Sequence, residues 1–411
     1  MLAVDLMTRF AVRTGLTVSD IAPTRYLWTD AFAVCNMLGS AKIDPHAIKR
    51  ALQLVEQVHN TLGRHRPDSV AKGWISGLTE SEGAAHPTIG GLRIGKKEPE
   101  GDGWDSDGQY FHYLTKWCVG MGLLRAKVCH GSLLSACNGL PPLPPSPRPP
   151  LRQIALDQLT WATGDAKFAE WALELADTAH KKFVLGPPGR RRMYWKMSVD
   201  LTRPLVASMG QHDPLEGYLT ALQLEATRRT LPTLQIKGPD LSKALEDYRS
   251  LIDAASLAST DSLGIGSLLL DVSRLSQLHV DQTLLKVLVK NAKVSLDRFT
   301  QLADLRQPAD RRLAFRELGL AIGLAAVART EHAGTFAPYQ QIGEQIKAFW
   351  EAPANRSMAM YIEHADINDV MLATCLAPDG VVCLHSAMTT STMQSLHTAS
   401  PQTSPGESTY N

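Results

Sequence analysis

Long apolar runs, an excess of charge of one sign and paired cysteines are all missing from this sequence of 411 residues. No stretch approaches the ~18 apolar residues that a membrane-spanning helix needs, and the N-terminus lacks the charged, apolar and small-residue order of a signal peptide. Lysine and arginine number 42 against 41 acidic residues, so the net charge of +1 gives no general attraction to nucleic acid or to anionic membranes. We therefore expect a soluble cytoplasmic protein that binds neither nucleic acid nor membrane.

The cysteines also exclude two classes of site. Six cysteines in so long a chain are too few and too scattered for a disulfide scaffold, and none forms Cys-x-x-Cys. The one adjacent cysteine and histidine pair is Cys129 and His130, and Cys35, Cys375 and Cys383 are not at the spacing of zinc ligands. We expect no metal site, which also argues against a zinc-dependent cyclase.

A string from Gly90 to Lys96 has the spacing of a phosphate-binding P-loop. No strand precedes it, no helix follows it directly, and Lys97 occupies the position of the Ser or Thr that holds magnesium. We therefore expect no nucleotide and no other cofactor. A flexible loop whose Arg93 or Lys96 binds an anionic group of the substrate is the better functional interpretation.

Strand signals are almost absent, whereas apolar residues recur at intervals of three and four, which is the period of amphipathic helices. The sequence therefore predicts an all-α protein. One set of helices is small and apolar around most of its circumference and should be buried: Ala31 to Gly39, Tyr110 to Trp117, Leu215 to Leu224, Leu263 to Leu275, Leu313 to Ala328, and Ile367 to Leu376. The other set has one polar face and should lie against solvent: Leu2 to Val12, Ile48 to Leu62, Phe168 to Phe183, Leu241 to Leu257, Leu284 to Leu302, and Tyr339 to Trp350.

Buried and exposed helices alternate along the chain, which gives six inner and six outer elements. Such alternation predicts an (α/α)6 toroid, a barrel of six helical hairpins, with an irregular helical array or solenoid as the alternative. The long connections, residues 63–109 and 186–211, lead into the N-terminal ends of inner helices. In a toroid they would form long rim loops around the mouth of a central cavity, where we expect a pocket.

We expect one domain over residues 1–384, interrupted by a proline-rich insertion at residues 118–153. Seven prolines between residues 141 and 150 exclude a helix there, and without the insertion the apolar spacing that ends at Trp117 continues from Leu156. The insertion is either foreign to the fold, as translated intron sequence would be, or a genuine proline-rich loop. The tail, residues 385–411, is rich in Ser, Thr and Pro and is expected to be disordered.

The first candidate motif runs from Tyr26 to Phe32, at the start of the first inner helix. Trp28 offers a ring on which the apolar face of a sugar can stack, and Asp30 offers a carboxylate for a hydroxyl group or a glycosidic oxygen. Thr29 and Asp30 are also predicted to cap this helix, and capping is compatible with a catalytic role.

The second candidate motif, Trp104 to Tyr113, leads into the second inner helix. Its aspartates, Asp107 among them, lie beside aromatic residues and could supply a partner acid or base. Tyr110 and His112 are candidate substrate-binding residues. For His112 the structural alternative is a buried, hydrogen-bonded imidazole.

Polar and aromatic residues are densest in the connection before the third inner helix. Trp195, Lys196 and Gln211 are candidate substrate-binding residues there. His212 and Asp213 offer a titrating group and a carboxylate, although aspartate followed by proline is also a strong helix-start pattern.

His364 is a further substrate-binding candidate, in the segment Glu363 to Asp369 that leads into the last inner helix. With it, carboxylates and histidines approach one predicted rim from four hairpins. This convergence of acids and aromatic rings predicts a site for a small-molecule or oligosaccharide substrate.

The entry Trp28-Thr29-Asp30-Ala31-Phe32, the alternating helices and the aromatic rim resemble the six-hairpin glycosidase superfamily, over nearly the whole chain apart from the insertion and the tail. In members that hydrolyse unsaturated uronyl sugars, an aspartate near the start of an inner helix is the general acid and base, and Asp30 matches it best. The second family aspartate has two candidates here, Asp107 and Asp213. In the related acylglucosamine epimerases cavity histidines transfer protons, a role that would fall to His212 and His364. Terpenoid cyclases share the toroid, but the chain lacks their aspartate-rich motif.

The resemblance implies a carbohydrate-active enzyme of the glycoside hydrolase type. In it Asp30 would protonate the departing oxygen, and Asp107 or Asp213 would position water or stabilise positive charge. Two alternatives stay open. One is a sugar epimerase or isomerase that uses cavity histidines, and the other is a non-catalytic carbohydrate-binding or scaffold protein.

Overall fold

The computed structural model describes residues 2–18, 20–101, 103, 105–118, 155–187 and 189–378. These residues are mostly helical, as the sequence predicts, and their strands are only two or three residues long. The predicted insertion, apart from Cys118, and the predicted disordered tail lie outside the described residues, as does Trp104.

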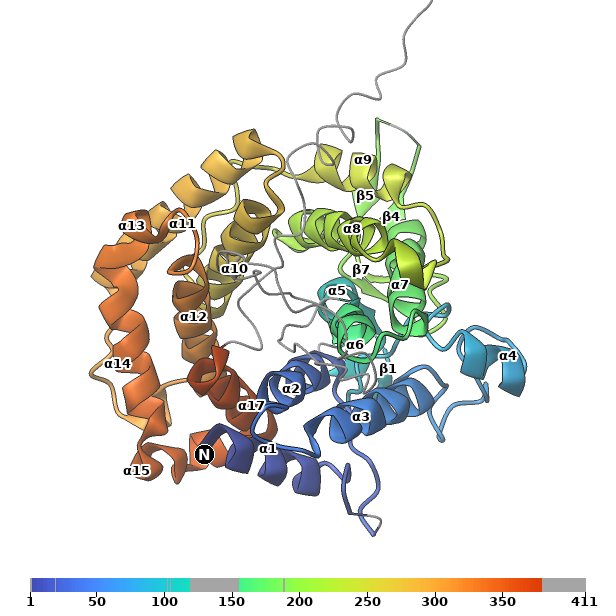
Figure 1. Ribbon diagram of the computed structural model, residues 1–411, viewed down its shortest axis with the longest axis horizontal. Coiled ribbons are helices and arrows are strands. Elements are labelled where there is room, and N and C mark those ends of the chain that lie inside the picture. The colour runs from blue at the N-terminus through green and yellow to red at the C-terminus, as the bar shows by residue number, and fades with distance from the viewer. Residues whose placement is uncertain are drawn as a thin grey trace, which may run out of the picture.

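Seven helices lie toward the middle of the molecule (Figure 1). They are α2 (Leu27–Ser40), α5 (Phe111–Cys118), α6 (Ala155–Thr163), α8 (Asp213–Thr230), α10 (Ser262–Leu278), α12 (Ala314–Val327) and α17 (Ala365–Leu376). Contacts pass from α2 to α5, α8, α10, α12 and α17 in turn, and α17 contacts α2 again. These helices correspond to the six segments that the sequence predicts to be buried, with α5 and α6 as the two parts of one of them.

Six amphipathic helices surround the inner ones (Figure 1). They are α1 (Leu2–Arg13), α3 (Ala47–Leu62), α7 (Lys167–Phe183), α9 (Ser242–Leu251), α11 (Gln282–Leu302) and α14 (Gln340–Glu351). Each packs on an inner helix: α1 on α17, α3 on α2, α7 on α5 and α6, α9 on α8, α11 on α10, and α14 on α12. Their burial follows the helical period, as α3 shows by burying Ala51, Leu54, Val55 and Val58.

The remaining elements are short and lie in the connections. They are α4 (Glu80–Ala85), β1 (Glu98–Glu100), β2 (Ser106–Asp107), β3 (Gln109–Tyr110), β4 (Val184–Leu185), β5 (Arg192–Met193), β6 (Lys196–Met197), β7 (Pro204–Val206), α13 (Ala333–Phe336), α15 (Pro353–Arg356) and α16 (Ala359–Glu363), with 3-10 turns at Pro232–Leu234, Ala309–Arg311 and Ala337–Tyr339. β3, β6 and β7 form an antiparallel sheet in which Gln109 pairs with Met197. This sheet joins the two long connections that the sequence singles out.

The start of α2 differs from the prediction. The helix begins at Leu27, two residues before Thr29 and three before Asp30, so Asp30 does not precede the helix as its cap. Instead its Oδ2 accepts a hydrogen bond from the backbone N–H of Tyr26 at 2.9 Å, from within the first turn. One backbone donor at the end of the helix is satisfied in this way.

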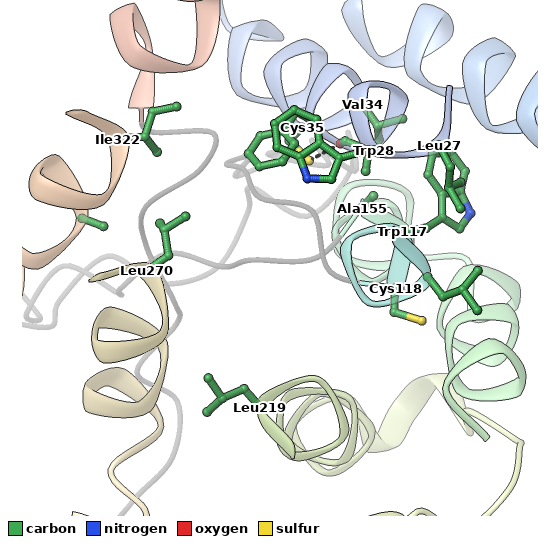
Figure 2. Close-up of a cluster of buried hydrophobic side chains, with 14 of the residues drawn as sticks. Leu27, Trp28, Val34, Cys35, Trp117, Cys118, Ala155, Leu219, Leu270 and Ile322 are labelled. Atoms are coloured by element: carbon green, nitrogen blue, oxygen red, sulfur yellow. Dashed lines mark hydrogen bonds between the residues drawn. The ribbon is translucent and has the colours of Figure 1, made fainter. Parts of the chain in front are cut away.

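The hydrophobic core includes side chains of both the inner and the outer helices. Figure 2 shows Leu219, Leu270 and Ile322 extending from α8, α10 and α12 toward the middle, with Trp28 and Cys35 of α2 nearby. Leu219 is fully buried, and burying such a side chain stabilises the fold by about 1.5–3 kcal/mol.

Glycines set the closest approach between inner helices, at the contact of α10 with α12. A Cβ atom added to Gly266 would overlap the backbone carbonyl group of Gly319. A Cβ atom added to Gly323 would lie 2.5 Å from the carbonyl oxygen of Gly266. The two backbones therefore touch, and a side chain at this point would force the helices apart.

We predict that Gly266→Ala lowers the free energy of unfolding by about 2 kcal/mol, because the added methyl group meets backbone that cannot move alone. Gly334→Ala is the matched control, since a Cβ atom there would have nothing within 4 Å. It should change the free energy by less than about 1 kcal/mol. Urea unfolding followed by circular dichroism measures both, and equal effects would contradict the close helix contact.

Candidate functional site

A cavity of about 820 Å³ opens where the N-terminal ends of the inner helices meet. Every inner helix that begins at this end contributes to it: Asp30 of α2, His112 of α5, Glu216 of α8, Leu263 of α10, Phe315 of α12 and Asp366 of α17. Its size is within the range of ~300–1,000 Å³ typical of small-molecule sites. Of the predicted site residues, it brings together Asp30, Trp28, Lys96, Tyr110, His112 and His364.

Asp30 is a buried acid in this cavity, with 1% of its surface exposed. Its Oδ1 lies 3.3 Å from Nη1 of Arg25, and that arginine is fixed by donating to the carbonyl oxygens of Thr14 and Thr24. Burial raises the pKa of Asp30 to about 6, although Arg25 and the Tyr26 N–H oppose the rise. The carboxyl group can therefore carry a proton in mildly acidic solution.

Glu216 is the second buried acid, and its environment lowers its pKa, whereas the environment of Asp30 raises the pKa of that acid. Its Oε1 accepts from Nζ of Lys116 at 2.9 Å, and its Oε2 accepts from Oγ1 of Thr115 at 3.0 Å. Burial acts to raise the pKa of Glu216, but Lys116, His112 and these hydrogen bonds outweigh it and hold the pKa below its usual value. Glu216 is therefore an ionised carboxylate lining the same cavity as Asp30.

Aromatic and imidazole rings line the same cavity as the two acids. The hydroxyl groups of Tyr26 and Tyr113 are 2.5 Å apart, and the ring of Tyr110 stacks beside His112 with centroids 5.7 Å apart. Burial lowers the pKa of His112 to about 4, because the charged imidazolium would lose its hydration. His112 is therefore a neutral imidazole over most of the pH range in which the protein would be assayed.

Asp107 and Arg93 lie elsewhere, and the structure corrects both assignments. Asp107 is fully buried outside the cavity, and its Oδ2 accepts from Nη1 of Arg93 at 2.5 Å. Its Oδ1 accepts from the backbone N–H of Gly95 at 3.1 Å. Arg93 also donates to the carbonyl oxygens of Thr61 and Arg64. Their charges are used to hold the loop on the end of α3, so neither is available to substrate.

His212 and Asp213 also fall outside the residues that line the cavity. Asp213 is the first residue of α8 and accepts the backbone N–H of Gly210 at 3.0 Å. The N-cap position is held by His212, whose side chain makes no capping hydrogen bond, so the prediction that Asp213 caps this helix is wrong. Burial and the negative charge of Glu216 raise its pKa to about 7. Burial lowers the pKa of His212. Since neither residue lines the cavity, the structure gives no support to the catalytic roles predicted for them.

Three further candidates are corrected in the same way, since none lines the cavity. Nζ of Lys196 is buried and donates to the backbone carbonyl oxygen of Ser106 at 2.8 Å. Trp195 stacks on Tyr110 with ring centroids 4.8 Å apart, so it packs against a residue that lines the cavity without lining the cavity itself. Gln211 is exposed, and its Nε2 reaches the carbonyl oxygen of Ala258 at 3.4 Å.

The cavity residues that the sequence interpretation did not select include a charged pair, Glu216 and Lys116. Both are charged residues inside segments predicted to be buried on most sides, or at the edge of one. A buried charge needs a partner of opposite charge, and here Glu216 and Lys116 are partners of each other. That mismatch between residue type and predicted burial was the signal that could have identified them.

We predict that Arg93→Met lowers the free energy of unfolding by about 3 kcal/mol, because it leaves the buried Asp107 carboxylate with only the more distant Arg66, at 3.9 Å, as a cationic neighbour. Lys96→Met is the control, since Nζ of Lys96 is 3.6 Å from the exposed Asp105 and such pairs contribute less than about 1 kcal/mol. Chemical unfolding measures both. If the double variant Arg93→Met, Asp107→Leu regains no stability, the pairing is not the cause.

We also predict a pH-dependent effect of Asp213→Asn, which keeps an oxygen to accept the Gly210 N–H. The folded pKa of Asp213 is raised, so its contribution to stability is present at low pH and is lost as the pH rises through about 7. Relative to the natural protein, the variant should gain roughly 2–3 kcal/mol between pH 5 and pH 8. Asp165→Asn, at an exposed aspartate that accepts the N–H of Lys167, should give no such trend. The same difference at both pH values would refute the assignment.

Other observations limit what the site can be. In the part of the chain that the structure describes, no group of three His, Cys, Asp or Glu residues is placed to hold a metal ion. None of the helices described combines the length and the apolar composition needed to cross a membrane. No protein-family model matches the chain, and neither the curated proteins nor the solved structures contain a significant match to it. The functional argument therefore depends on the geometry of the cavity.

Proposed function

We propose that this protein is a carbohydrate-active enzyme of the glycoside hydrolase type, built on an (α/α)6 toroid like that of the six-hairpin glycosidase superfamily. The fold part of the proposal is supported by the order of helix contacts, in which the inner helices follow one another from α2 to α17 and α17 returns to α2. The position of the cavity at their N-terminal ends agrees with such a ring.

The observation that carries the function is a pair of acids in one cavity whose pKa values are moved apart. Asp30 has a raised pKa of about 6 and Glu216 has a lowered pKa. Such a difference is the usual basis for one carboxyl group acting as acid and the other as base or charge stabiliser. Glu216 thus replaces Asp107 and Asp213 as the partner of Asp30.

In the proposed reaction the protonated carboxyl group of Asp30 gives its proton to the glycosidic oxygen as the bond from that oxygen to the anomeric carbon breaks. A water oxygen bonds to the anomeric carbon, and the water proton passes to the carboxylate of Glu216. The products are the free sugar and the alcohol. Lys116, 2.9 Å from Glu216, keeps that carboxylate ionised before each cycle.

The aromatic residues suit a sugar. Trp28 lines the cavity one turn before Phe32, and the two rings lie 4.6 Å apart at their centroids. A pyranose ring has an apolar face that stacks on such a surface, while the hydroxyl groups of Tyr26 and Tyr113 are placed to bond its oxygens. This arrangement accounts for aromatic rings beside the two acids.

A sugar epimerase or isomerase is the second candidate, because His112 and His364 line the same cavity. A neutral imidazole such as His112 can accept a proton from carbon, which is the step that an epimerase needs. His212 cannot take part from its position outside the cavity. The incorporation of solvent deuterium into a sugar, without loss of an alcohol, would favour this candidate over hydrolysis.

We predict that kcat/KM for glycoside hydrolysis falls as the pH rises through about 6, because Asp30 must be protonated to act as the acid. Asp30→Asn should remove this pH dependence and lower kcat/KM for methyl glycosides by roughly 10²–10⁴-fold. With 4-nitrophenyl glycosides the loss should be smaller, because that leaving group needs little protonation. Glu216→Gln should impair both substrates.

Asp165→Asn is the control for these variants, since this aspartate, whose side chain is 41% exposed, lies outside the cavity. Circular dichroism and thermal unfolding check that each variant is folded, and the pH profile of the natural protein tests the acid without any substitution. A profile that stays flat from pH 5 to pH 8, or full activity of Asp30→Asn on methyl glycosides, would rule out the proposed acid.

A further inference from the structure

The cavity has an apolar side that the proposed hydrolysis does not use. Five large apolar side chains line it, and we call them the apolar arc: Leu263, Leu313, Phe315, Ile362 and Ile367. They come from the beginnings of α10, α12 and α17 and from α16. Ile362 is 59% exposed and Leu313 is 37% exposed. Apolar surface kept in contact with water inside a cavity is typical of a binding site for an apolar group.

Two cations beside the apolar arc are paired with carboxylates, whereas the exposed Glu363, next to Ile362, also lines the cavity. Nε of Arg13 lies 2.7 Å from Oδ1 of Asp366, and Nη1 of Arg316 lies 2.5 Å from Oδ1 of Asp261. The imidazole of His364 meets the ring of Phe315 edge to face, with centroids 6.3 Å apart. Apart from the carboxylate of Glu363, this side of the cavity therefore presents mainly hydrocarbon, an imidazole and paired charge.

The opposite side of the cavity is polar, and we call Asp30, His112, Lys116 and Glu216 the polar arc. These residues come from α2, α5 and α8, whereas the apolar arc comes mainly from α10, α12 and α17. Since contacts run around the ring in the order α2, α5, α8, α10, α12, α17, the two arcs occupy different halves of one cavity. A ligand that fills the cavity meets both.

We propose that the substrate is a glycoside with an apolar aglycone, an alkyl or aryl group, which lies on the apolar arc while the sugar lies on the polar arc. The sugar part rests on the proposed function. A volume of about 820 Å³ is near the upper end of the range for small-molecule sites, so a single sugar ring leaves room on the apolar side. The apolar group removes the exposed side chains from water, and each buried methylene group adds to the affinity.

Binding of octyl and methyl glycosides of the same sugars, below micelle-forming concentrations, tests the proposal. Isothermal titration calorimetry with the full chain should show the octyl glycoside binding at least ~10-fold more tightly than the methyl glycoside. Ile362→Ser and Leu313→Ser should each reduce this ratio about threefold or more and leave the affinity for the methyl glycoside unchanged. Both positions are exposed, so the variants should fold.

Ile43→Ser is the matched control, because Ile43 is 70% exposed but lies outside the cavity, and it should leave the ratio unchanged. Equal affinity for octyl and methyl glycosides, or the same ratio in Ile362→Ser as in the natural protein, would overturn the apolar arc as a binding surface. Hydrolysis without any preference for the octyl group would overturn this inference but not the hydrolase. Binding that depends on Ile362, without cleavage of any glycoside, would overturn the hydrolase and retain the apolar subsite.

Discussion

The structure is organised by the cost of removing charged groups from water on helices that are buried on most sides. Three charged pairs show how that cost is met: Asp30 with Arg25, Glu216 with Lys116, and Asp271 with Arg274. The third pair lies deeper on α10, where burial raises the pKa of Asp271 to about 6 and Arg274 also donates to Gln223 of α8. Each pair is bonded to a neighbouring segment, either through the partner itself or through a further hydrogen bond of the partner. The positions of the acids therefore depend on the packing of the inner helices.

Helix periodicity was enough to predict the helical elements, because burial on one face or on most faces leaves a local mark in the sequence. It misplaced the start of α2, since Asp30 has the residue type of a cap but makes its bond to Tyr26 from inside the first turn. The contact of Gly266 with Gly319 was also beyond the sequence. The small residues are visible in the sequence, but which helix they face depends on how the inner helices pack against one another.

The site was predicted less well than the helices, for a physical reason. Whether an acid faces a cavity or a cation depends on contacts between segments, as Asp107 shows by pairing with Arg93. Lys196 likewise has the residue type of a substrate-binding group, yet its Nζ is occupied by carbonyl oxygens near Ser106. Asp30 and Trp28 were found because they begin an inner helix, and Glu216 was missed because the preceding Asp213 has the stronger capping pattern.

The division of the cavity follows from the connections between helices. Long connections lead into α5 and α8, and the sheet of β3, β6 and β7 joins them, so this half of the rim holds Tyr110 in place through strand pairing. Shorter segments lead into α10, α12 and α17. On this side the cavity is lined mainly by residues in the first turns of these helices, such as Leu263 of α10 and Phe315 of α12. Under the proposed function, a polar half and an apolar half suit a substrate with two chemically different ends, because the reacting bond is then held at the acids while the other end contributes affinity.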